Sequence, residues 1–333
     1  MPRRILALPV LASIALALAL VAGASARTNS GSIALVAYST PRAAYADLIP
    51  AFQKTPAGKD TSFQQSYGAS GEQARAVEAG LKADVVALSL EPDVTTLVNK
   101  GIVPRNWKND KWGGIVTRSV VVFAVRKGNP KKIRDWEDLV KPGVQIVTPN
   151  PKTSGGARWN YLAAWGYAQK KFGSPDKAKQ FVGDLFKNVP VLDTGARGST
   201  VTFVERGVGD VLLAWENEAF LAQREFGKDK FEIVAPPLSI LAEPPVAIVD
   251  KVVAKKGTAA VAEAYLKYWY TKEGQEIAAR NSYRPRDSEI AREYEKSFAK
   301  VELFTIDDVF GGWTKAQKEH FAEGGIFDQI YKN

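Results

Sequence analysis

The chain has 333 residues, of which 45% are apolar and 24% charged, the balance of an ordinary globular protein with room for two domains. The absence of cysteine excludes disulfides, thiol chemistry and a lipid-modified cysteine. The formal net charge of +9 comes from basic residues spread along the chain and not from a basic block interleaved with aromatic residues, so composition does not support a nucleic-acid partner.

Residues 1–26 have the organisation of a secretory signal peptide. Arg3 and Arg4 precede an apolar run over 5–22, and an Ala-x-Ala sequence ends at Ala26. A retained membrane anchor is the alternative, because the run approaches the length that spans a bilayer. The Ala-x-Ala ending favours cleavage after Ala26, so we expect a periplasmic protein that is held together by its core alone.

The first third of the mature chain repeats the order strand, turn, helix. We expect strands over 33–38, 63–67 and 84–90, followed by helices over 41–52, 72–79 and 92–100. Pro41 suits the first position of its helix, and Ser70 is expected to cap the second helix. Repeated βα units predict a parallel sheet flanked by helices.

The central part continues this alternation, and its clearest feature is a capped helix that begins after Ser154. Strands are expected over 119–125, 144–147, 189–192 and 210–215, and helices over 136–140, 155–170, 176–186 and 216–226, with a short helix that ends at Gly207. Ser154 is placed as the N-cap, and Gly155 and Gly156 leave the N–H groups of the first turn bare.

Proline-rich stretches mark the places where the chain passes between two lobes. Pro-Pro pairs at both ends of 235–245 predict one passage, and an outgoing passage is expected near 117–122. Two passages predict a discontinuous first lobe over 27–116 and 246–300, an inserted second lobe over 117–245, and a cleft between them. The mainly helical segment 301–333 is not assigned to either lobe.

Four of the predicted turns bring a helix N-terminus to the carboxyl end of a strand. They are Ser39-Thr40-Pro41, Ser70-Gly71, Ser154-Gly155-Gly156 and Gly195-Ala196. Ligands collect at this edge of open α/β sheets, and bare N–H groups at the positive end of a helix dipole suit an anion with several oxygens. A single Ser-Gly-Gly more commonly serves a tight turn, so the hypothesis of an anion site depends on the turns converging.

A site made only of donors suits sulfate, which has no proton to donate near neutral pH. Monohydrogen phosphate leaves its own O–H without an acceptor there, a mismatch that costs about 1–3 kcal/mol when buried. Glu72, Asp193 and Glu216 lie near the candidate turns, and any of them could be that acceptor. The residues and their spacing therefore predict an anion without identifying which anion it is.

Motifs for catalysis and for cofactors are missing from the sequence. Ser154 has no His, Cys or Lys motif beside it to act as a base, and the single histidine, His320, has no partner for a metal site or a triad. We expect His320 to have a surface or packing role. Neither a Walker loop nor GxGxxG occurs, so we expect no cofactor, no metal, no catalytic residue and no enzyme. The tryptophans expected to be structural are Trp136, Trp159, Trp165 and Trp269.

Three segments of the chain closely resemble the periplasmic sulfate-binding proteins of ABC importers. They are 154–168, 195–200 and 214–218, and the likeness extends over nearly the whole mature chain, including 283–286 and 310–313. The resemblance implies an α/β fold of the two-lobed type II periplasmic binding protein kind, with a mostly parallel sheet flanked by helices in each lobe. It also implies a protein, expected to be a monomer, that delivers sulfate to the membrane permease of an ABC transporter.

Matched residue by residue, the resemblance implies a sulfate site made by Ser39, Ser70, Ser154, Gly155, Gly156, Ala196 and Trp215. It assigns a donor from the first lobe to Ser70, the hydroxyl to Ser154, amides to the two glycines and Ala196, and the indole N–H to Trp215. Ser39 stands where the family usually has aspartate, and a serine keeps the backbone N–H of that contact. Tyr67 and Ala69 replace the usual His and Gly, which changes the shape of the first-lobe wall. Arg197 is expected to steady its helix without touching sulfate.

Two alternatives stay open. A binding protein of the same kind could take thiosulfate in addition to sulfate or in its place. A secreted esterase or phosphatase could use the same anion site, although no activating base accompanies Ser154.

Overall fold

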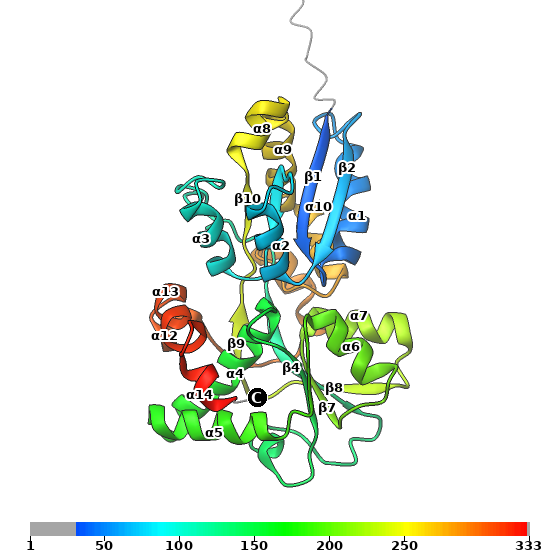
Figure 1. Ribbon diagram of the computed structural model, residues 1–333. Coiled ribbons are helices and arrows are strands. Elements are labelled where there is room, and N and C mark those ends of the chain that lie inside the picture. Colours follow the sequence, from blue (N-terminus) through cyan, green and yellow to red (C-terminus); the bar gives the residue numbers. More distant parts are fainter. Residues whose placement is uncertain (1–30, 332–333) are drawn as a thin grey trace, which may run out of the picture.

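The computed structural model describes residues 31–331, so the predicted signal peptide lies outside the described residues. Figure 1 shows two bodies, one above the other, with a β-sheet in each. One sheet has four strands in the order β10-β3-β1-β2, and the other has seven, in the order β11-β9-β4-β7-β5-β6 with β8 paired to β4. We call the body around the four-stranded sheet the first lobe and the other the second lobe. The predicted α/β fold class is confirmed.

The first lobe sandwiches its sheet between two layers of helices. Its strands are β1 (Ser32–Tyr38), β2 (Ser62–Gly68), β3 (Val85–Ala87) and β10 (Val246–Ile248), and its helices are α1 (Arg42–Gln53), α2 (Ser70–Glu78), α3 (Glu91–Asn99), α8 (Asp250–Lys256), α9 (Ala259–Trp269), α10 (Lys272–Arg280) and α11 (Ser288–Glu293). β1 is parallel to β2 and β3, whereas β10 is antiparallel to β3. Leu35 and Ala37 pack in one buried cluster and Val36 in another, because successive side chains leave opposite faces of the strand.

The second lobe is built around β4 (Ser119–Arg126), which is antiparallel to its three neighbours. The other strands are β5 (Ile146–Pro149), β6 (Val191–Asp193), β7 (Val211–Trp215), β8 (Phe231–Val234), β9 (Leu238–Ala242) and β11 (Glu302–Phe304). The helices from its central part are η1 (Trp136–Val140), α4 (Gly155–Phe172), α5 (Pro175–Lys187), α6 (Ala196–Val204) and α7 (Glu216–Phe226). β5 is parallel to β6 and β7, so their carboxyl ends meet at one edge.

Most expected elements occur within a few residues of their predicted bounds, and the differences are local. The proline-rich passage contains a strand, β9, that pairs with β4 and β11. Ser70 is the first residue of α2 and Ala69 is its N-cap, because the Ser70 hydroxyl is used by Asp93 and by the Ser89 N–H. Pro41 likewise lies one position earlier than expected, as the N-cap of α1.

Three passages of chain lie side by side between the lobes. Isolated β-bridges join Ile115 to Pro245 and Arg118 to Arg284. The Arg118 guanidinium pairs with Glu243 at 2.8 Å. Arg284 donates two hydrogen bonds, of 2.7 and 2.9 Å, to the buried carboxylate of Glu216 at the start of α7. Ion pairs and bridges therefore hold the connecting segments together. We expected two passages, and the chain crosses a third time between α11 (Ser288–Glu293) in the first lobe and β11 (Glu302–Phe304) in the second.

The C-terminal segment packs on the second lobe. After η2 (Glu295–Ser297) it forms β11, α12 (Ile306–Phe310), α13 (Trp313–Ala316), η3 (Gln317–Phe321) and α14 (Ile326–Ile330). β11 pairs with β9, and Phe304 lies so close to Gly166 of α4 that a β-carbon there would meet the ring at 2.2 Å. A glycine at 166 is thus needed for this close packing.

His320 is buried within this segment, as expected of a packing residue. Its ring packs on Trp165 and Phe310, and its Nδ1 hydrogen-bonds with the Tyr161 hydroxyl at 3.1 Å. Burial lowers the pKa of His320 to about 4 from the ordinary value of 6.5. Between residues 31 and 331 no helix is both long and apolar enough to cross a membrane.

We expect His320 to make the protein less stable in mild acid. Because its pKa is about 4 in the folded state and 6.5 ordinarily, the unfolded chain binds more protons as pH falls through this window. The free energy of unfolding should therefore fall by up to about 1.4 kcal/mol per pH unit from this residue alone. Urea unfolding of wild type and His320→Gln at pH 7, 5.5 and 4.5 measures it. Parallel pH profiles for the two proteins would contradict the assignment.

Candidate anion-binding site

Five helix N-termini meet at one small cavity between the lobes. α1 and α2 reach it from the first lobe, and α4, α6 and α7 from the second, each after the carboxyl end of a strand. The lining residues are Tyr38, Ser39, Thr40, Gly68, Ala69, Ser70, Ser89, Ser154, Gly156, Asn160, Ala196, Thr200, Leu212, Leu213, Ala214, Trp215 and Glu218. Each helix start contributes backbone N–H groups without intrahelical partners, so the cavity is surrounded by donors.

Ser154, Gly156, Ala196 and Trp215 come together on the second-lobe wall. A β-carbon on Gly156 would lie 3.5 Å from the Ala196 β-carbon, 3.6 Å from Ser154 Oγ and 3.8 Å from Trp215 Nε1. Ser154 is the N-cap of α4, and its Oγ accepts the Ala157 N–H at 3.3 Å. That bond uses a lone pair of the oxygen and leaves the hydroxyl proton for another acceptor.

Trp215 ends β7 and holds its indole against residues of both lobes. The ring lies 5.8 Å from that of Tyr38 and 6.4 Å from that of Trp159. Trp215 is only 4% exposed, and its Nε1 is buried without an acceptor among residues 31–331. A buried indole N–H normally has a hydrogen-bond partner, so this donor is suited to a ligand in the cavity that it lines.

The first-lobe wall is made by the turns before α1 and α2. Ser39 and Thr40 line the cavity from the first turn and Ser70 from the second. The Ser70 Oγ donates to Asp93 Oδ2 at 2.5 Å and accepts the Ser89 N–H at 2.9 Å, so its proton is directed at Asp93. Burial raises the pKa of Asp93, against the opposing effects of nearby Arg158 and of this hydrogen bond.

Gly155 is the one predicted site residue that does not line the cavity. It packs instead against the first lobe, where a β-carbon would lie 2.0 Å from Ser89 Oγ and 2.7 Å from Leu90 Cγ. Its amide still stands at the first position of α4, between Ser154 and Gly156. The absence of a side chain at 155 therefore lets the two lobes touch.

Glu218 is a cavity residue that the sequence prediction missed. Its Oε1 accepts hydrogen bonds from Thr200 Oγ1 at 2.9 Å and from Arg197 at 3.0 Å, and its Oε2 is buried without a partner in the described chain. Burial raises the pKa of Glu218, and the positive charge of Arg197 opposes that effect. Glu218 lies three residues after Trp215 at the start of a predicted helix, and this spacing could have indicated that the two side chains lie on the same face.

The charge of the cavity wall depends on which of the nearby carboxylates line it. Glu72, Asp193 and Glu216, which sequence reasoning considered, are not among the lining residues. Arg197 pairs with both Glu218 and Glu225 and does not line the cavity. A bound anion would therefore meet neutral donors and helix dipoles on most sides, with Glu218 as the one carboxylate in the wall.

Comparison with known proteins identifies the class to which this arrangement belongs. The model of the bacterial extracellular solute-binding protein family matches residues 33–284, and the chain belongs to this family. The chain is 58% identical over 318 residues to the sulfate-binding protein of Escherichia coli K12, which covers 94% of this chain and 97% of that protein. It is 51% identical over 301 residues to the thiosulfate-binding protein of Pseudomonas aeruginosa PAO1, covering 89% and 91%.

Solved structures agree with this assignment. The sulfate-binding protein of Mycobacterium tuberculosis H37Rv is similar with a TM-score of 0.82 and 37% identity, covering 86% of this chain and 98% of that one. The substrate-binding protein of an ABC transporter from Agrobacterium tumefaciens, at 16% identity and a TM-score of 0.65, shares the fold. The resemblance predicted from the sequence is confirmed.

The geometry around Gly156 makes a direct test of the cavity possible. In Gly156→Ala the new methyl would touch its neighbours at ordinary contact distances, so we expect the fold to be kept. The methyl would occupy space beside Ser154 Oγ and Trp215 Nε1, and we expect sulfate binding to weaken by about 1–3 kcal/mol. Calorimetric titration and thermal unfolding measure the two effects.

Gly183→Ala is the matched control for that substitution. It also places alanine in a helix, where the new β-carbon would be 3.8 Å from Ile330 Cγ2 and remote from the cavity lining. This variant should bind as the wild type does. Equal affinity of all three proteins would show that the space beside Gly156 is not used by the ligand.

Proposed function

We propose that this protein captures sulfate in the cavity between its lobes and delivers it to the membrane permease of an ABC importer. One observation carries the proposal: the buried Trp215 N–H, the Ser154 hydroxyl and the start of α4 surround one point beside Gly156. Such preorganised donors suit a tetrahedral oxyanion, and each charge-assisted hydrogen bond contributes about 1.5–3 kcal/mol. The relatives named for sulfate and thiosulfate support the same ligand class.

The second lobe would supply most of the donors in this proposal. Ser154 gives its hydroxyl proton, Gly155 and Gly156 give amides at the start of α4, Ala196 gives the first amide of α6, and Trp215 gives its indole N–H. These groups include two helix N-termini, whose dipoles favour a dianion. Sulfate would thus be held without a direct counter-charge from Arg197.

The first lobe would complete the shell with backbone groups. Ser39 offers an amide from the turn before α1, as the sequence suggested. Ser70 offers its own N–H at the first position of α2, because its hydroxyl proton is directed at Asp93. Donors from both lobes mean that the full site exists only when the lobes are together.

Sulfate and thiosulfate are both consistent with this donor set. Each is a tetrahedral dianion without a proton near neutral pH, and the relative at 51% identity is named a thiosulfate-binding protein. Monohydrogen phosphate needs an acceptor, and Glu218 is the carboxylate at the cavity wall. Both of its hydrogen bonds, from Thr200 and Arg197, go to Oε1, and Oε2 is the one acceptor that a protonated anion could use. We infer that phosphate is disfavoured because every other group proposed to contact the anion is a donor.

We also infer the setting in which binding takes place. The first lobe is assigned 31–116 and 246–300 and the second 117–245 with 301–331, the last range because β11 pairs with β9. Residues 1–26 are inferred to direct export to the periplasm and to be removed. We infer a monomer without a cofactor, as the family resemblance implied. We also infer no catalysis, since no residue that lines the cavity is a histidine, lysine or cysteine able to activate Ser154.

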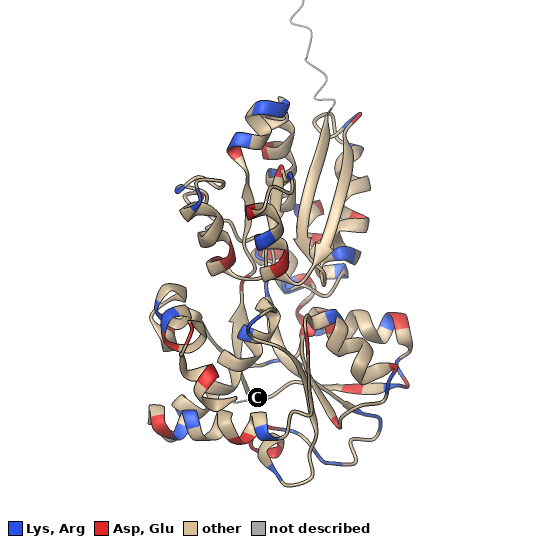
Figure 2. Cartoon of the chain, in the orientation of Figure 1, with Lys and Arg blue, Asp and Glu red and all other residues tan. Residues whose placement is uncertain are grey.

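Charge on the surface fits a soluble carrier of small anions. Figure 2 shows Lys and Arg positions interspersed with Asp and Glu positions along the ribbon of both lobes, a distribution that does not favour one continuous basic face. A long nucleic acid needs such a face, whereas a small anion needs only the local donors of the cavity. We therefore infer no nucleic-acid partner.

Removing single donors tests the site assignment. Ser154→Ala and Trp215→Phe should each weaken sulfate binding by about 1–3 kcal/mol, because each deletes a hydrogen bond to a buried anion. Ser174→Ala is the matched control, since Ser174 caps α5 through Lys177 N–H at 3.4 Å and does not line the cavity. Calorimetry should find the control unchanged. Wild-type affinity in both site variants would remove the assignment.

A titration panel separates the candidate ligands. Sulfate, thiosulfate, molybdate and phosphate are titrated into the wild-type protein at pH 6, 7 and 8. We expect sulfate or thiosulfate to bind with little dependence on pH, because neither is protonated in this range, and phosphate to bind more weakly at each pH. Hydrolysis of aryl sulfate or phosphate esters, or preferential phosphate binding, would contradict the proposed function.

A further inference from the structure

We propose that Trp159 is a positioning residue for anion binding, which acts by hydrogen-bonding the second lobe to the first when the cleft is closed. The proposal rests on the proposed function, because it assigns a role in binding to a residue that does not line the cavity. Its basis is an indole–carbonyl bond between Trp159 and Ser89, residues 70 positions apart in the chain.

The bond crosses the boundary between the lobes. Trp159 lies in the second turn of α4, is 1% exposed, and donates its Nε1–H to the Ser89 carbonyl oxygen at 2.7 Å. Ser89 lies in the first lobe between β3 and α3, and it is also buried. Because both partners are removed from water, breaking the bond without separating the lobes would leave two unsatisfied polar groups.

Ser89 joins this bond to the first-lobe wall of the anion site. Its N–H donates to Ser70 Oγ at 2.9 Å, while its carbonyl accepts from Trp159. Ser70 stands at the start of α2, and Ser154 stands five residues before Trp159 at the start of α4. A single residue thus links the helix starts that face the anion from opposite lobes.

The indole is held by its own lobe, so it moves with that lobe. Its ring packs edge-on against Trp313 at 4.7 Å and near Trp215 at 6.4 Å, both from the second lobe. Tyr38 and Leu90 of the first lobe are buried in the same cluster. Close approach at this point also needs Gly155, whose missing side chain leaves room for Ser89.

Opening the cleft would break the bond and hydrate both partners. The bond is therefore an interaction of the closed form alone, and it shifts the open–closed equilibrium towards the form that binds the anion. Apparent affinity is reduced by the fraction of molecules that are not in the competent form. Loss of the bond should accordingly raise the dissociation rate of the anion and leave the association rate less affected.

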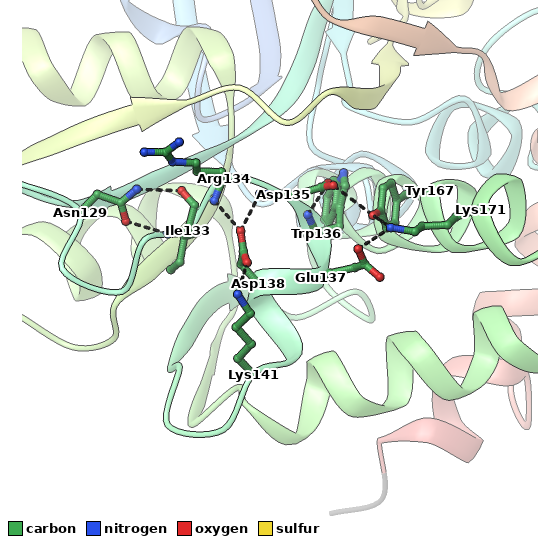
Figure 3. Close-up of polar contacts among 10 residues, drawn as sticks. All are labelled: Asn129, Ile133, Arg134, Asp135, Trp136, Glu137, Asp138, Lys141, Tyr167 and Lys171. Atoms are coloured by element: carbon green, nitrogen blue, oxygen red, sulfur yellow. Dashed lines mark hydrogen bonds and ion pairs between the residues drawn. The ribbon is translucent and has the colours of Figure 1, made fainter.

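Trp159→Phe and Trp136→Phe form a matched pair for the test. Trp136 is also fully buried and donates its indole N–H to a carbonyl, that of Leu238 at 2.8 Å, but both partners belong to the second lobe. Figure 3 shows Trp136 among other polar contacts of that lobe, where Asp135 accepts its backbone N–H. Each variant loses one indole hydrogen bond, and only one of those bonds crosses the cleft.

We expect the two variants to separate binding from stability. In Trp159→Phe the Kd for sulfate should rise about tenfold, mainly through koff measured by stopped-flow tryptophan fluorescence. The rise in Tm caused by saturating sulfate should shrink as well. Trp136→Phe should lower the Tm of the unliganded protein and keep the wild-type Kd. Trp159→Met, which fills an aromatic space without an N–H, repeats the test if phenylalanine does not fold.

Small-angle scattering adds a direct readout of cleft closure. With sulfate below saturation, Trp159→Phe should show the larger radius of gyration, because fewer molecules are closed. Wild-type Kd and koff in Trp159→Phe, or the same increase in Kd in Trp136→Phe, would overturn the role of Trp159. If the wild-type protein binds neither sulfate nor thiosulfate, the proposed function is overturned instead. In that case an equal radius of gyration for unliganded wild type and unliganded Trp159→Phe overturns the role of Trp159 as well.

Discussion

The convergence of helix N-termini on a buried cavity is the constraint on which the rest of this structure depends. A helix start leaves backbone N–H groups without intrahelical partners, and an unsatisfied buried donor costs about 1–3 kcal/mol. The strands before α1, α2, α4, α6 and α7 all end at this cavity, so the cost is concentrated in one place. The proposed oxyanion would satisfy several of these donors at once, which would join the stability of the closed form to the occupancy of the site.

The charged side chains beside the site neutralise one another in ion pairs. Arg197 lies directly after Ala196, yet its guanidinium is paired with Glu218 and Glu225. The field in the cavity therefore comes from peptide dipoles and the indole N–H, whose directions are set by the fold. Fixed donors of this kind favour an anion whose shape matches their directions and that carries no proton. A flexible cationic side chain would favour an anion by charge alone. Glu218 is the exception in the wall, because its Oε2 is a buried acceptor without a partner in the described chain.

Contact between the lobes depends on a few residues that match closely. Gly155 allows Ser89 to approach α4, and Ser89 connects Ser70 to Trp159 through its two backbone groups. The lobes therefore meet through specific polar contacts as well as through the apolar cluster around Trp215. Interfaces built in this way have few intermediate arrangements, because partial separation removes the hydrogen bonds and exposes the polar groups together.

The sequence by itself determined the order of strands and helices, the Ser154 cap and the family, because these depend on neighbouring residues and on short motifs. Six of the seven predicted site residues line one cavity, since helix starts after parallel strands share an edge. Only the tertiary structure decided that Asp93 takes the Ser70 proton, that Glu218 lies in the wall, and that Trp159 reaches Ser89. Those contacts join elements that are far apart in the chain, and no local spacing encodes which side chains meet when the two lobes pack.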